Sequence, residues 1–269
     1  MKSMRRIYIA LILLFLYAPI LVMILFSFNE SASTATLTGF GFKWYKELFA
    51  KDEVAEALKN TLILAVLSSL IAGVLGTAAA VGISRMKKIF RTPVLTITNI
   101  PMMNPDIVTA VSLLMLFVFV SSLIGVSSRS FFTVLIAHIT FNLPYVVLSV
   151  MPKIRQMDKN LPEAAQDLGC TPLQSFFLVE LPAILPGVLS GMLMAFTLSL
   201  DDFIITQFTK GEGFYTLPTY IYSMTKKKVK PDMYALSSLI FVVILVLMVA
   251  SNMIQARMEE KNNPQKKKK

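Results

Sequence analysis

LPEAAQDLGCTPLQSFFLVELP, residues 161–182, predicts two short helices joined by a hinge and set between two long apolar segments. Pro162 suits the first position of a helix, where its missing N–H costs nothing. Gly169 can adopt the left-handed conformation that ends a helix. Thr171 and Pro172 then supply an N-cap and a first turn for a second helix.

The second of these helices has one apolar face, formed at helical spacing by Leu173, Phe176, Phe177 and Leu181. We expect Pro182 and Pro186 to end it, because proline interrupts a helix interior. A small rigid hairpin of this kind can transmit force from a membrane domain to a soluble partner. Ala164 and Ala165 would allow close approach of the partner, and Glu163 would offer a directional polar contact. The alternative is a structural hairpin that lies on the membrane surface.

Outward from this hairpin, the chain contains six uncharged or nearly uncharged segments: Ile7–Phe28, Asn60–Ser84, Pro93–Leu123, Ser130–Met151, Leu185–Phe208 and Met233–Ala256. Each reaches the roughly 20 residues that a membrane-spanning helix needs. Since lipid offers no partners to an open strand, the fold class is predicted to be all-α, a polytopic membrane protein with six transmembrane helices. The first segment exceeds the apolar core of a signal peptide, so we expect a retained anchor. Residues 1–256 form the predicted membrane domain, and residues 257–269 a basic tail.

Charge is concentrated outside these segments. The chain carries 26 Lys and Arg against 16 Asp and Glu, a net charge of +10, in short connections and in the tail Lys266–Lys269. This pattern favours contact with membrane lipid and not with nucleic acid. The distribution of basic residues between loops agrees only weakly with a cytoplasmic N-terminus. The 85–91 loop, which would be cytoplasmic, supports this orientation. The opposing residues, which would lie outside, are Lys226, Lys227, Lys228 and Lys230. Single residues, Cys170 and His138, predict neither a disulfide nor a metal site.

Several residues predict how the helices pack. Small residues at four-residue spacing let helix backbones approach closely in lipid; they are Ala72, Gly76 and Ala80, then Gly187, Gly191 and Ala195. His138 and Asn142 lie four residues apart on one helix face. That spacing favours a hydrogen bond between helices over a proton relay.

Three carboxylates fall within apolar segments, where charge is costly and usually marks a pathway. Asp106 follows Asn104 and Pro105, which we interpret as the N-cap and first turn of a new half-helix at a break in the third segment. Asp201 and Asp202 lie towards the outer end of the fifth segment. Adjacent carboxylates repel each other, and a bound ammonium group relieves that repulsion.

These acids therefore suit a cation path, with Ser199 beside them to donate or accept a hydrogen bond. Alternatively, Asp106 and Asp201 pair with basic residues of a neighbouring helix or cap helices. Trp44, the only tryptophan, either binds an ammonium group through its ring face or anchors the chain at the membrane interface. Tyr145 could line the same path.

Residues 161–182 resemble the EAA loop of the permease subunits of ATP-binding-cassette (ABC) importers. That loop has the pattern EAA, three residues, Gly, nine residues, Ile, any residue, Leu-Pro. The matching positions are Glu163, Ala164, Ala165, Gly169, Leu181 and Pro182, and Val179 replaces Ile. The resemblance implies the MetI-like permease fold and a bacterial inner-membrane location with cytoplasmic termini. It also implies a cytoplasmic loop that contacts an ATPase through Glu163, Ala164, Ala165, Asp167 and Gly169.

Colinear short matches further resemble the permeases of spermidine/putrescine importers: Lys43-Trp-Tyr45, Asn104-Pro-Asp-Ile-Val108, Ala137-His-Ile-Thr-Phe141, Ser199-Leu-Asp-Asp202, Leu217-Pro218 and Ile221-Tyr-Ser-Met224. The resemblance implies half of a translocation path for polyamines. The expected path residues are Asp106, Asp201, Asp202, Ser199 and Trp44. Whether the substrate is spermidine or putrescine stays open.

The chain has no G-x-x-x-x-G-K-[ST] motif, so we expect no enzymatic site and no cofactor in this chain, with ATP and Mg bound by a partner. The expected partners are a second permease chain (a paralogue or an identical copy, which the sequence leaves open), a dimer of ATP-binding subunits and an extracytoplasmic polyamine-binding protein. The alternatives are an importer permease for another small solute and an ion-coupled secondary carrier that uses the acids. A membrane enzyme is the weakest of these alternatives, since the sequence shows no convincing set of a nucleophile and a general base.

Overall fold

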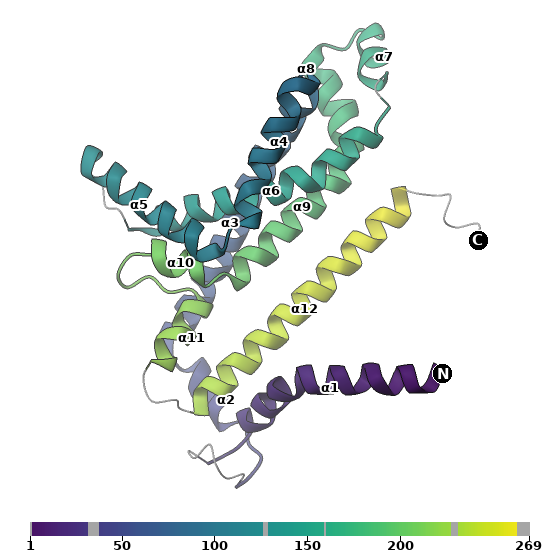
Figure 1. Ribbon diagram of the computed structural model, residues 1–269. Coiled ribbons are helices and arrows are strands. Elements are labelled where there is room, and N and C mark those ends of the chain that lie inside the picture. Colours follow the sequence, from purple (N-terminus) through teal and green to yellow (C-terminus); the bar gives the residue numbers. More distant parts are fainter. Residues whose placement is uncertain (1, 32–37, 126–128, 159, 227–230, 263–269) are drawn as a thin grey trace. The chain divides into compact units, whose positions relative to one another are not determined.

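A computed structural model describes residues 2–31, 38–125, 129–158, 160–226 and 231–262, and these are almost entirely helical (Figure 1). The helices are α1 (Lys2–Ser27), α2 (Lys43–Phe49), α3 (Asp52–Arg85), α4 (Lys88–Met103), α5 (Asp106–Ile124), α6 (Phe131–Gln156), α7 (Leu161–Asp167), α8 (Pro172–Ser175), the π-helix η1 (Phe176–Glu180), α9 (Leu181–Asp201), α10 (Ile204–Thr209), α11 (Leu217–Thr225) and α12 (Pro231–Asn262). The predicted all-α fold is confirmed. Of the predicted basic stretches, Lys227, Lys228, Lys230 and Lys266–Lys269 lie outside the described residues.

Six helices among the described residues are long and apolar enough to cross a membrane, which confirms the predicted number of spans. They are Arg6–Ser27, Asp52–Arg85, Asp106–Ile124, Phe131–Gln156, Pro172–Asp201 and Asp232–Ala250. The boundary predicted at residue 256 is not a helix boundary, because α12 continues to Asn262.

The third predicted segment, Pro93–Leu123, is two helices. α4 ends at Met103 and α5 begins at Asp106, so the break was predicted correctly, but only α5 qualifies as a span. The predicted cap is wrong by one residue. Asn104 is the C-cap of α4, and the N-cap of α5 is Pro105, whose carbonyl accepts from Val108 N at 2.9 Å.

The predicted end of the second hairpin helix at Pro182 and Pro186 is wrong. Helix runs without interruption from Pro172 to Asp201, so the fifth span begins well before Leu185. A π-turn, Phe176–Glu180, precedes the first proline. Leu181 N donates to Phe176 O, five residues back instead of four. This change in the hydrogen-bond register accommodates Pro182, which has no N–H to donate.

The chain divides into two compact units. Unit 1 comprises residues 1–59 and 215–246, and its apolar cluster joins α2, the start of α3, α11 and α12 through Leu48, Val54, Ala57, Leu217, Tyr220 and Leu236. An ion pair between Lys51 and Asp232 ties α12 to the α2–α3 connection. Unit 2 comprises residues 60–214 and 247–269.

The core of unit 2 is α6 packed against α9 and α3. The predicted small residues lie at these contacts, because a Cβ on Gly76 would stand 2.7 Å from Val146 Cβ, and one on Gly191 would stand 3.0 Å from Val146 Cα. Gly187 likewise faces Ser149 O. The prediction of close helix packing is confirmed. In Figure 1, α7 and α8 lie at one end of the α6–α9 pair, and α10 lies near the other.

Candidate functional site

The hairpin α7–α8 has the local structure that its sequence predicts. Gly169 follows α7 with a φ of +95°, in the left-handed region. Thr171 Oγ1 accepts from Gln174 N at 3.3 Å, and Gln174 Oε1 accepts from Thr171 N at 2.9 Å, which makes a capping box for α8. Ser175 Oγ donates to Pro162 O at 3.1 Å, so the two arms are tied to each other.

The residues predicted to contact an ATPase divide into two groups. The exposed ones are Glu163, Ala164, Asp167 and Gly169. Ala165 is only 8% exposed and packs inside the hairpin. Apolar side chains accompany the exposed group, since Leu168 and Leu173 are 88% and 71% exposed. The hairpin therefore presents both polar and apolar surface, while the contact itself stays a prediction.

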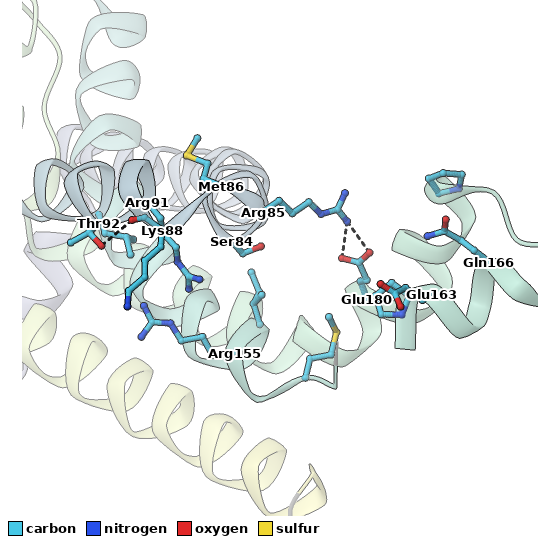
Figure 2. A pocket seen from close by; sticks show the side chains of 15 residues that line it. Ser84, Arg85, Met86, Lys88, Arg91, Thr92, Arg155, Glu163, Gln166 and Glu180 are labelled. Carbon is cyan, nitrogen blue, oxygen red and sulfur yellow. Dashed lines mark hydrogen bonds and ion pairs between the residues drawn. The ribbon is translucent and has the colours of Figure 1, made fainter. Parts of the chain in front are cut away.

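A pocket of about 910 Å³ lies beside the hairpin, between the end of α3, the start of α4 and the end of α6 (Figure 2). Arg85 donates to both carboxylate oxygens of Glu180, at 2.8 and 3.0 Å, and the Glu180 side chain is only 9% exposed. Sequence reasoning missed this pair. The signal was present, because Glu180 stands between Val179 and Leu181 and a carboxylate there requires a counter-charge.

Asp202 is held by the chain's own groups. Its Oδ2 accepts from Thr206 N and from Thr206 Oγ1, both at 2.8 Å, and its Oδ1 accepts from Ile205 N at 3.2 Å. His138 Nε2 lies 3.3 Å from Oδ2, and the Asp202 side chain is 9% exposed. The Asp202 carboxylate thus caps the first turn of α10 from the position before the N-cap residue Phe203, and its predicted place on a cation path stays a prediction.

Ser199 lies at the centre of a buried polar network that joins three helices. Its Oγ is 2.7 Å from Asn142 Nδ2, 2.8 Å from Ser68 Oγ and 3.1 Å from His138 Nδ1. His138 Nε2 is in turn 2.9 Å from Thr206 Oγ1. The predicted hydrogen bond between helices from His138 and Asn142 is confirmed. Ser199 makes hydrogen bonds within this network, and its predicted role beside the acids of the path stays a prediction.

Asp106 and Asp201 are exposed, at the first position of α5 and the last position of α9. Tyr145 on α6 packs on the apolar cluster that includes Ala110, one turn after Asp106 on α5. The Tyr145 ring lies 5.6 Å from that of Phe141. Tyr145 and Leu198, one turn before Asp201, both pack on the apolar cluster that joins α5, α6 and α10. Unit 2 thus combines accessible carboxylates with aromatic rings.

Trp44 belongs to unit 1 and is 8% exposed. Its Nε1 donates to Asn29 O at 2.6 Å, and Lys43 Nζ lies 4.9 Å from the ring centroid. The indole N–H is thus hydrogen-bonded within the chain, and the Lys43 ammonium group of the same chain lies over the ring.

The hairpin, the six spans and the tight α3–α6–α9 core agree with the result of a family comparison. The sequence from residue 72 to residue 262 matches the binding-protein-dependent transport system inner membrane component. The chain belongs to this permease family. As a member of it, the chain is a multi-pass membrane protein and a transport subunit.

Similar permeases share most of their length with this one. The putrescine transport system permease protein PotI of Escherichia coli K12 is 37% identical over 249 residues, which cover 91% of this chain and 88% of PotI. The spermidine/putrescine transport system permease protein PotC of the same organism is 36% identical over 262 residues, which cover 97% of each chain.

Solved structures support the fold of the permease. A bacterial ABC transporter that imports the acidic polysaccharide alginate has a chain with a TM-score of 0.73 and 23% identity, covering 95% of this chain and 94% of that one. A chain of the MetNI methionine ABC transporter has a TM-score of 0.59 and 17% identity, covering 76% and 95%. The predicted MetI-like permease fold is therefore confirmed.

Proposed function

We propose that this permease forms half of the translocation path of an ATP-driven polyamine importer. The observation that carries the proposal is the identity of 36–37%, over more than nine tenths of the chain, with permeases named for putrescine and for spermidine/putrescine transport. Identity at that level, without large gaps in coverage, makes a shared substrate class the simplest expectation. The accessible acids of unit 2 support it.

Asp106 and Asp201 are the path residues in this proposal. Both carboxylates are exposed, and the rings of Tyr145 and Phe141 pack in the apolar cluster that includes Ala110, one turn after Asp106. Carboxylates and aromatic faces are the groups that bind ammonium in proteins. Asp202 and Ser199 play a different part, because their oxygens are engaged with helix N–H groups and buried side chains. They position the break between α9 and α10.

The hairpin α7–α8 is proposed to lie in the cytoplasm and to dock on an ATP-binding subunit, with both termini on the same side. ATP and Mg are bound in a dimer of those subunits and not in this chain. A second permease chain, a paralogue, completes the path, and an extracytoplasmic polyamine-binding protein delivers the substrate. The exposed apolar residues Leu168 and Leu173 support docking, since a partner would cover them.

The first test is uptake of radiolabelled spermidine and putrescine by proteoliposomes that contain the permease and its co-purified partners. Uptake should require ATP on the side of the membrane that carries the ATP-binding subunits. It should persist when no ion gradient is present. Asp201→Asn and Asp106→Asn should raise the KM for polyamine about tenfold or more, because each removes a charge from the path. Glu56→Gln, which removes an exposed charge from unit 1, is the matched control and should leave KM unchanged.

Two results would contradict this assignment. Uptake driven by an ion gradient without nucleotide would establish the carrier alternative. Import of another solute, with polyamines unable to compete, would show that the chain is an importer permease of different specificity.

A second test addresses the hairpin. Glu163→Lys should reduce co-purification of the ATP-binding subunit and substrate-stimulated ATP hydrolysis, since it reverses an exposed charge in the first turn of α7. Glu56→Lys makes the same charge reversal in unit 1 and should preserve both. Equal ATPase coupling in the two variants would show that the hairpin surface is not the docking site.

A further inference from the structure

The pocket beside the hairpin has a basic wall that the proposed transport function does not use. Four cationic side chains line it, Arg85, Lys88, Arg91 and Arg155, together with Glu163 and Glu180. Glu180 is already paired with Arg85. Within the described part of the chain, Lys88, Arg91 and Arg155 have no carboxylate at ion-pair distance. Figure 2 shows Arg91 and Arg155 extending towards each other across the cavity.

This basic pocket continues into an apolar one. A second cavity of about 340 Å³ shares Leu95 and Arg155 with the first, and its other lining residues are Asn99, Leu148, Met151, Pro152 and Gln156. Arg91 Nη2 lies 3.6 Å from Met151 Sδ, so its guanidinium stands where the two cavities meet. The combined groove is cationic at the hairpin end and mainly aliphatic beyond it.

The helix that forms one wall has the character of an interfacial helix. Lys88, Arg91, Leu95 and Asn99 line the cavities from one face of α4, at spacings of three and four residues. Its remaining surface includes exposed apolar side chains, since Ile89 is 74% and Ile97 is 64% exposed, beside the exposed Thr92 and Thr96. α4 is nevertheless not among the six spans. A helix with basic and exposed apolar residues that does not span is typical of the boundary between headgroups and acyl chains.

We propose that this groove binds an anionic phospholipid. The phosphate of the headgroup lies between Lys88, Arg91 and Arg155, and one acyl chain follows Leu95, Leu148 and Met151. Basic pockets between membrane helices are known to select anionic headgroups. The aliphatic part of the groove offers contacts to an acyl chain, and a free phosphate ion would not fill it. Because the groove adjoins Glu163 and Gln166 of the hairpin, a bound lipid touches the segment that couples to the ATPase in the proposed function. Lipid binding itself does not depend on that function.

The test measures lipid binding to the purified full-length chain in mild detergent by native mass spectrometry. The probes are phosphatidylglycerol, phosphatidylcholine and inorganic phosphate. The parent should prefer phosphatidylglycerol to phosphatidylcholine. Arg91→Gln with Arg155→Gln should weaken phosphatidylglycerol binding about tenfold or more, which is the scale expected for two basic residues near a lipid surface. The matched control, Lys46→Gln with Lys59→Gln, removes two exposed charges from unit 1 and should change nothing.

Two further variants separate the possible sources of the anion. Leu95→Trp fills the aliphatic part of the groove and should weaken phosphatidylglycerol binding. The ability of inorganic phosphate to compete with the lipid headgroup should stay the same in this variant. Arg91→Lys with Arg155→Lys keeps the charge and should retain the lipid preference, which guards against a general loss of structure in the glutamine variant.

Three outcomes would overturn the proposal. Unchanged phosphatidylglycerol binding in the glutamine variant would exclude these arginines as the headgroup site. Unchanged lipid binding in Leu95→Trp, together with displacement by inorganic phosphate, would identify a site for a free anion. Loss of the ATP-binding subunit from the glutamine variant, with lipid binding intact, would identify an acidic protein surface as the occupant.

Discussion

Replacement of Asp202 by alanine should destabilise unit 2, whereas the same change at Asp201 should not. The Asp202 carboxylate accepts three hydrogen bonds from Ile205 and Thr206 and lies against His138, with its side chain 9% exposed. Removal of it leaves two backbone N–H groups at the start of α10 without their cap and leaves the His138 ring facing a void. Asp201 is exposed at the end of its helix.

The size of the effect follows from these contacts. An N-cap contributes about 0.5–2 kcal/mol, and hydrogen bonds to a charged group contribute about 1.5–3 kcal/mol. Because the terms share the same atoms, they do not add fully, and we expect a loss of about 3 kcal/mol in the free energy of unfolding. At about 2–4 °C per kcal/mol for a chain of this size, the Tm should fall by about 6–12 °C.

The assay is thermal unfolding of the purified permease in detergent, followed by the reactivity of a thiol dye. Cys170 is the only cysteine, belongs to unit 2 and is partly buried, so an increase in its reactivity on heating reports unfolding of that unit. Asp201→Ala should change the Tm by little, since exposed substitutions usually cost within about 0.5 kcal/mol. If Asp202→Ala unfolds at the parent temperature, or if Asp201→Ala loses as much, the distinction between a structural and an accessible acid is refuted.

Three further predictions concern other contacts. Gly76→Ala should cost about 1–3 kcal/mol because its Cβ would meet Val146 at 2.7 Å, whereas Gly82→Ala, with nothing within 4 Å, should not lower the Tm in the same thiol assay. Arg85→Ala should cost about 1.5 kcal/mol in thermal unfolding, the low end for a charged hydrogen bond because Arg85 is 61% exposed, and Arg85→Lys should recover part of it. The pKa of Tyr220 is raised to about 12 by burial and by its hydrogen bond to Glu53, so the folded state holds the proton more tightly than the unfolded state. Its contribution is therefore complete below about pH 10 and lost between about pH 10 and 12, and Tyr220→Phe should abolish that loss in unfolding curves followed by Trp44 fluorescence.

The sequence predicted those parts of the structure that depend on local chemistry. The hinge at Gly169 and the cap at Thr171 follow from the conformations and side chains of single residues, and both are present. Six spans follow from hydropathy alone. The close packing of α3, α6 and α9 follows from the spacing of small residues such as Gly76 and Gly191.

Prediction failed where the outcome depends on a change of helix register or on residues distant in sequence. Pro182 was expected to end a helix, but a π-turn just before it removes the conflict. Asp202 also lies beside His138, sixty-four positions earlier, and no spacing rule relates the two. Arg85 and Glu180 are paired for the same reason, at a separation of 95 residues.

The uninterrupted helix from Pro172 to Asp201 has a mechanical consequence. Its 30 residues span about 45 Å, and they join the exposed hairpin directly to the acid at the end of α9. If this helix tilts as one body about its glycine contacts with α6, its two ends move in opposite directions. The π-turn lies on the longer of the two arms, between the hairpin and Gly187, where a small change in helical winding would alter how far the hairpin end moves.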